Sequence, residues 1–71
     1  MDDYQRYKEE QERIATRREV VREALLAATQ NRDFASMLKL TAELIELDKA
    51  TLENTKLFIK YLEDLTRDTQ K

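Results

Sequence analysis

The chain has 71 residues and carries 13 basic and 15 acidic side chains, so its net charge is −2. It contains no Gly, Pro, Cys, His or Trp, which excludes disulfides and removes the usual residues of tight turns and β-hairpins. A chain of this length forms one small domain at most, and its many Leu, Ala, Glu, Lys and Arg residues are strong helix formers, so an all-α fold is predicted.

The first predicted helix runs from about Asp3 to Gln30 and has one thin apolar face. Its bulky residues alternate in steps of four and three, with Gln11 and Arg18 at two polar positions of the same seam. These bulky residues are Tyr4, Tyr7, Ile14, Val21, Leu25 and Ala28. Because positive and negative charges nearly cancel, we do not expect the chain as a whole to be disordered, but residues 1–12 are the part most prone to fray.

The stretch TQNRDF, residues 29–34, is expected to be a turn, because the steps of four and three lose their phase there. We expect Asn31 to adopt a left-handed conformation at the end of the first helix. Asp33 is a good N-cap for a second helix from about Phe34 to Asp68. The alternatives are an uninterrupted helix, or a third helix after a break at residues 51–55, where Thr and Asn dilute the helix formers.

The two helices are expected to form an antiparallel hairpin, in which facing residues have numbers that sum to about 65 because the chain turns near residue 32. Gln11 then faces Asn54, and Arg18 lies near Asp48 and Glu46. Polar pairs in a seam commonly set the register of the helices. Four aromatic residues are expected to cluster at the open end of the hairpin: Tyr4, Tyr7, Phe58 and Tyr61.

The second helix has two apolar stripes, which together are wider than one packing face requires. The first stripe consists of Met37, Leu40, Leu44, Leu47, Thr51, Phe58, Tyr61 and Leu65. The second consists of Phe34, Leu38, Ile45, Leu52, Ile59 and Leu62. The thin face of the first helix can cover only part of this surface, and a large exposed apolar patch usually marks an interface.

We therefore expect a protein–protein interaction module that is completed by dimerisation, or by docking on another protein, into a four-helix type of bundle. The four aromatic residues, with Phe58 and Tyr61 among them and Tyr4 and Tyr7 opposite, belong either to the hairpin's own core or to the partner surface. The residues predicted to bind a partner are Leu38, Ile45, Leu52, Phe58, Ile59, Tyr61 and Leu62.

Enzymatic chemistry is not expected, because the chain lacks the histidine and cysteine that most often serve as general base and thiol nucleophile. The only serine, Ser36, falls in the first turn of the second helix, where it is expected to help cap the helix. Without Gly there is no phosphate-binding loop, and bundle metal sites of the Glu-x-x-His kind lack their histidine. We accordingly expect no cofactor, no metal and no small-molecule substrate.

The alternative partner is nucleic acid, which four arginines of the first helix could contact: Arg13, Arg17, Arg18 and Arg22. Acidic residues alternate with them, and Glu9 precedes Arg13 by four residues, the favourable order for a helix-surface ion pair. A salt-bridged, solvated face is therefore the preferred interpretation.

The start MDDYQRYKEEQER is unlike a secretory signal, and no apolar run approaches the ~20 residues that span a bilayer. A cytoplasmic location is therefore expected. Export without a cleaved signal stays open as an alternative.

Two resemblances suggest more specific roles. The stretch TLENTKLFIKYLEDL, residues 51–65, resembles the second helix of the small helical-hairpin co-chaperones of type III secretion needle subunits, which pair with a helical-repeat chaperone to keep the needle subunit soluble. This resemblance implies partner-facing residues around Leu52, Ile59 and Leu62. The stretch NRDFASMLKLTAELIEL, residues 31–47, is similar to helical pieces of the oligomerisation cores of phage small terminase subunits, which implies a packaging or nucleic-acid-linked oligomeric regulator.

Overall fold

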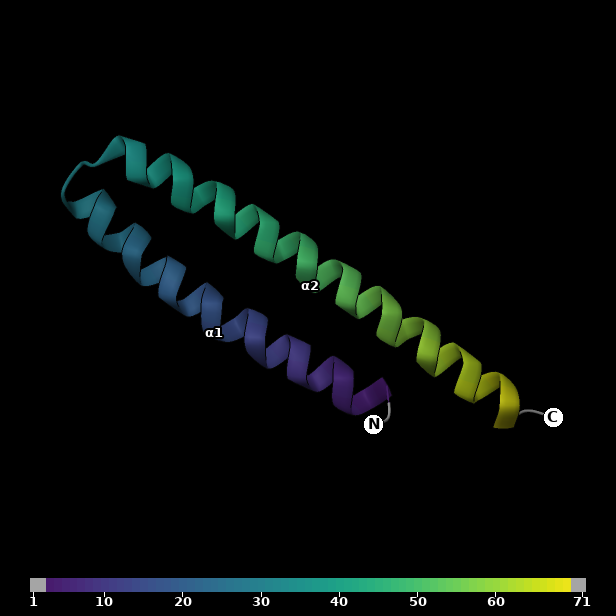
Figure 1. Cartoon of the computed structure of the whole chain (residues 1–71). Coiled ribbons are helices and arrows are strands. Elements are labelled where there is room, and N and C mark those ends of the chain that lie inside the picture. Colours follow the sequence, from purple (N-terminus) through teal and green to yellow (C-terminus); the bar gives the residue numbers. More distant parts are fainter. Residues whose placement is uncertain (1–2, 70–71) are drawn as a thin grey trace.

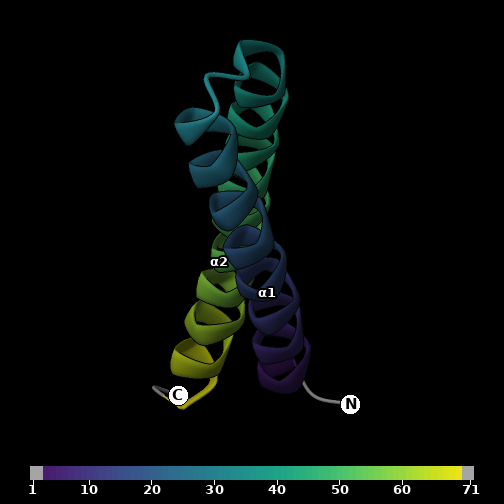
Figure 2. The same ribbon diagram turned by 90° about the vertical axis from the view of Figure 1, so that its left-hand side faces the viewer.

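The computed structural model describes residues 3–69, which form two helices joined by a short turn. Helix α1 spans Asp3–Gln30 and helix α2 spans Phe34–Thr69. They run antiparallel and side by side, in a rod with dimensions of 59 × 17 × 13 Å (Figure 1). In the view turned by 90° the two helices cross while staying in contact (Figure 2). The predicted all-α hairpin is confirmed, whereas residues 1 and 2 of the segment expected to fray lie outside the described range.

The turn uses a hydrogen-bonding pattern that ends many helices, but with a different residue from the one predicted. Arg32, not Asn31, has the positive φ, at 54°. The Arg32 backbone N–H donates to the Thr29 carbonyl, and the Asp33 N–H donates to the Ala28 carbonyl at 2.9 Å. These are the two bonds of a Schellman motif, which requires the left-handed residue one position after Asn31. The prediction for Asn31 was wrong because the hydrogen-bond geometry of the motif, rather than residue preference, selected the position.

Asp33 caps the start of α2, as its side chain and position predicted. Its Oδ1 accepts the Ser36 backbone N–H at 3.2 Å, and its Oδ2 accepts the Ser36 hydroxyl at 2.6 Å. These two hydrogen bonds from Ser36 lower the pKa of the Asp33 carboxyl, because both favour its charged form. The same short turn therefore ends one helix and starts the next without glycine.

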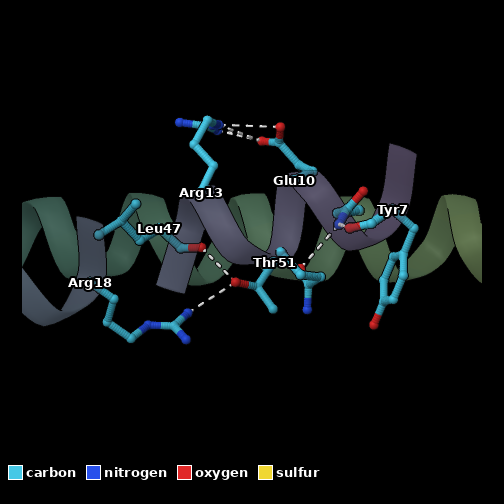
Figure 3. Close-up of polar contacts among 8 residues, drawn as sticks. Tyr7, Glu10, Arg13, Arg18, Leu47 and Thr51 are labelled. Atoms are coloured by element: carbon cyan, nitrogen blue, oxygen red, sulfur yellow. Dashed lines mark hydrogen bonds and ion pairs between the residues drawn. The ribbon is translucent and has the colours of Figure 1, made fainter. Parts of the chain in front are cut away.

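Helix α2 continues without interruption through residues 51–55, so the alternative with a third helix is not what forms. The β-branched Thr51 fits into the helix because its hydroxyl donates to the Leu47 carbonyl, four residues earlier, at 3.0 Å (Figure 3). The continuous helix keeps both of its apolar stripes straight along the rod.

The buried core of the hairpin is small. The largest fully buried side chains are Ile14 and Val21 of α1, each 1% exposed, and Leu47 of α2 packs against them. The partly buried residues around this cluster are Leu40, Leu44 and Ala50. Fully burying one such side chain contributes about 1.5–3 kcal/mol, so this core gives a lone hairpin only modest stability.

Candidate interaction surface

One side of α2 stays uncovered along nearly its whole length. We call this side the outer stripe, and all its members are exposed except the half-buried Thr55: Phe34, Leu38, Thr41, Ile45, Asp48, Leu52, Thr55, Ile59 and Leu62. Its six large apolar residues are between 43% and 74% exposed, with Leu62 the lowest and Leu38 the highest. The members alternate in steps of four and three, which is the spacing of a seam in a coiled coil. The stripe predicted to be in surplus is therefore the one that α1 leaves exposed.

The other stripe of α2 is the inner seam, which packs against α1. It consists of Met37, Leu40, Leu44, Leu47, Thr51, Asn54, Phe58 and Tyr61, all of them buried or half-buried. Leu65, predicted for this stripe, is 45% exposed, because α2 continues past the part of α1 that could cover it. The inner seam and the outer stripe lie roughly 100° apart around the helix axis, given about 100° per residue.

The aromatic residues predicted for the open end belong to the hairpin itself. The rings of Tyr7 and Phe58 stack with centroids 4.1 Å apart, and Tyr4 and Tyr61 each lie 6.0 Å from Phe58. Of the two roles left open for Phe58 and Tyr61, the structure places both half-buried in this cluster, off the outer stripe. Phe58 and Tyr61 were predicted to bind a partner, but they lie on a different surface from the other five predicted residues, which belong to the outer stripe: Leu38, Ile45, Leu52, Ile59 and Leu62.

Polar side chains set the register between the helices. The Asn54 amide is buried and donates to Gln11 Oε1 at 3.0 Å and to the Tyr7 carbonyl at 3.2 Å. Arg18 donates from Nη2 to Asp48 Oδ1 at 3.0 Å. The same nitrogen donates to the Thr51 hydroxyl at 2.9 Å (Figure 3). The predicted pairs of Gln11 with Asn54 and of Arg18 with Asp48 are confirmed. A slip of the helices would leave the buried amide without partners, which is unfavourable.

Two other predicted pairs were wrong. Glu46 bonds Lys49 on its own helix rather than Arg18. Arg13 forms a forked contact with Glu10, three residues earlier, as Figure 3 shows, rather than with Glu9. Glu9 instead accepts a hydrogen bond from the Gln5 amide at 3.1 Å. Positions three and four residues away are both within reach on a helix, so spacing alone does not choose between them.

A further ion pair between the helices was not predicted. The Arg17 guanidinium makes two hydrogen bonds to Glu43, with Nη2 to Oε1 at 3.0 Å. The hydrogen bond from Arg17 lowers the pKa of Glu43, and the same contact raises the pKa of Arg17. Both residues lie beside the inner seam, on the side opposite the outer stripe. Their opposite charges at positions flanking the seam were the sequence signal from which this pair could have been predicted.

The arginines of the nucleic-acid alternative are mostly occupied. Arg13, Arg17 and Arg18 are each bonded to a carboxylate. Only for Arg22 is there no carboxylate partner among residues 3–69. A phosphate group would have to displace these carboxylates, so the geometry gives this alternative no support.

The described part of the chain offers no other prominent site. Within residues 3–69, no three acidic side chains gather closely enough to hold a metal ion. Neither helix between Asp3 and Thr69 combines the length and the apolar composition of a membrane span. Comparison of the chain with models of protein families, with curated proteins and with solved structures finds no match.

Proposed function

We propose that this protein is a non-enzymatic interaction module, acting as a chaperone, adaptor or assembly factor, and that its outer stripe packs against a helix of another protein chain. The observation that carries the proposal is the exposure of six large apolar side chains in one straight row, beside a seam that α1 already covers. Contiguous apolar patches on soluble proteins usually mark interaction surfaces.

The free energy at stake favours a covered stripe. A large apolar side chain contributes about 1.5–3 kcal/mol when it is fully buried, and these six still expose about half or more of their area. Covering all six therefore stabilises a complex by on the order of 5–9 kcal/mol before the losses of association are counted. A hairpin of this size supplies no more than about 3–5 kcal/mol by itself.

The geometry of the stripe favours a helical occupant. The backbone N–H and C=O groups of α2 are bonded within the helix, so an added β-strand would find no edge to pair with. A row with steps of four and three matches the knobs-into-holes packing of a second helix. Leu52, Ile59 and Leu62 are also the residues that the resemblance to type III co-chaperones places against a partner, so that resemblance points to the same surface.

Apolar-dye fluorescence on dilute protein tests the proposal. We expect the unmodified chain to bind the dye, and Ile59→Glu to reduce the fluorescence several-fold. Leu57→Glu is the matched control, because Leu57 is 68% exposed but lies roughly 200° around the helix from Ile59. Circular dichroism should show both variants to be helical. A monomer that melts cooperatively and binds no dye refutes the proposed function.

A further inference from the structure

We propose that the occupant of the outer stripe is a second copy of this chain, with the two α2 helices packed antiparallel about a twofold axis near Asp48 and Lys49. This inference rests on the proposed function and names its partner. In such a twofold interface, if residue i of the first copy contacts residue j of the second, then residue j of the first copy also contacts residue i of the second. The surface must therefore be complementary to itself.

The outer stripe has this property, because its chemistry reads the same in both directions. From Phe34 to Leu62 the order is apolar, apolar, Thr, apolar, Asp, apolar, Thr, apolar, apolar. In an antiparallel alignment, facing residues have numbers that sum to about 96 or 97. The facing pairs are then Phe34 with Leu62, Leu38 with Ile59, Thr41 with Thr55, and Ile45 with Leu52. Every apolar residue meets an apolar residue, each Thr meets a Thr, and Asp48 at the centre meets Asp48 of the copy.

The charge at the centre is the same in both orientations, so the arrangement of the four helices decides between them. The side chains of Asp48 and Lys49 are 71% and 68% exposed, and among residues 3–69 each is in one ion pair, Asp48 with Arg18 and Lys49 with Glu46. In the antiparallel alignment Asp48 of one copy meets Asp48 of the other at the axis, and the Arg18 guanidinium bonded to each of them offsets part of the repulsion. A parallel alignment also places Asp48 against Asp48, but its twofold axis runs along the helices and puts the two α1 helices on opposite sides of the α2 pair, so the four helices do not form a square bundle.

The size of the stripe is also that of a dimer interface. Its six apolar residues in each copy, one aromatic and five aliphatic, expose roughly 500–600 Å² per copy, given that a buried aromatic residue covers about 150–250 Å². Two copies reach on the order of 1,000–1,200 Å², at the lower limit of stable interfaces, before Thr and Lys stems are counted.

Helix α1 adds to the same face. Arg18 bonds Asp48 of the outer stripe, and Arg22 and Leu26 follow Arg18 at intervals of four, so they extend along the same side of α1. Leu26 is 60% exposed, and a hollow beside it is lined by Leu25 and Leu44.

A twofold axis perpendicular to the helices brings both copies of α1 to one side of the α2 pair, which gives the square arrangement of a four-helix bundle. The axis passes near residues 16–17 of α1, because these lie at the level of Asp48.

The mass in solution is the first test. Sedimentation equilibrium from micromolar to millimolar protein should give twice the 8.5 kDa of one chain. Ile45→Glu with Leu52→Glu should raise the dissociation constant at least 100-fold, whereas Leu57→Glu should leave it within about threefold. A chain that stays at 8.5 kDa at millimolar concentration overturns the dimer. If that monomer still binds the apolar dye, the proposed function stands without it, and if it does not, both fall.

Cysteine cross-linking tests the orientation, since the chain has no native cysteine. Lys49→Cys lies at the axis and should form disulfide-linked dimers readily. Leu38→Cys should not link to itself, because the two copies of residue 38 are roughly 30 Å apart along the helices at 1.5 Å per residue. It should instead link to Ile59→Cys when the two variants are mixed. Efficient self-linking of Leu38→Cys would show a parallel pair and contradict the inference.

Discussion

Ile14 and Ile45 are the same side chain in two different surroundings, so replacing each by Ala separates the inner seam from the outer stripe. Ile14 is 1% exposed and Ile45 is 51% exposed. Ile14→Ala should reduce the free energy of unfolding by about 2–5 kcal/mol, the range for deleting a buried aliphatic side chain. In a single chain Ile45→Ala should lower it by only about 1 kcal/mol, since about half of the side chain is already in water. The gain in helix propensity from Ile to Ala applies to both and cancels.

Thermal unfolding followed by circular dichroism at two protein concentrations measures the difference. In a domain of this size, 1 kcal/mol shifts the melting temperature by about 4–8 °C. Ile14→Ala should therefore lower it by about 10 °C or more at both concentrations. Ile45→Ala should lower it by about 5 °C in dilute protein and by clearly more in concentrated protein, where a partner covers the stripe. Leu57→Ala, on the other side of α2, is the control and should change the melting temperature little.

The reasoning would be refuted by equal losses for Ile14→Ala and Ile45→Ala in dilute protein. Such a result would mean that the single chain already buries the outer stripe, for example by bending α2 or by a different hairpin register. If the effect of Ile45→Ala does not depend on protein concentration, self-association through the outer stripe is contradicted, whereas the proposal that the stripe binds another protein is not.

Three further predictions concern the turn and the ion pair between the helices. Asp33→Ala should lower the free energy of unfolding by about 0.5–2 kcal/mol, because the cap needs a side-chain acceptor. Asp33→Asn keeps an acceptor and should lose only a small part of that stability, and urea unfolding measures both variants. Arg32→Gly should raise it by about 0.5–1 kcal/mol in the same assay, because glycine adopts positive φ without a steric penalty. The pKa of Glu43 is lower in the folded chain, so the stabilisation by its pair with Arg17 is present above its ordinary pKa of 4.5 and is lost as the pH falls through the lower folded value. The stability difference between the unmodified chain and Glu43→Gln should therefore shrink between pH 5 and pH 3, and a constant difference would contradict this pair.

The fold and most of the seam could be predicted from residue spacing. The positions of Ile14 and Val21, seven residues apart, identified the buried face of α1, and the loss of phase at residues 29–34 located the turn. Once the turn was placed, the antiparallel register followed, and with it the contact of Asn54 with Gln11 and the cluster around Phe58. These features depend on helix periodicity and on chain length, both of which are properties of the sequence.

The sequence by itself determined that this chain forms two helices and that α2 has more apolar surface than α1 can cover. Only the tertiary structure showed how far each side chain of the predicted surplus stripe is exposed, which carboxylate each arginine bonds, and that Arg32 rather than Asn31 takes the left-handed conformation. The physical reason is that periodicity specifies the direction in which each side chain points from its own helix axis. The choice between neighbouring partners depends on how the two helices are rotated against each other, and a rotation of one residue step, about 100°, exchanges one stripe for the other.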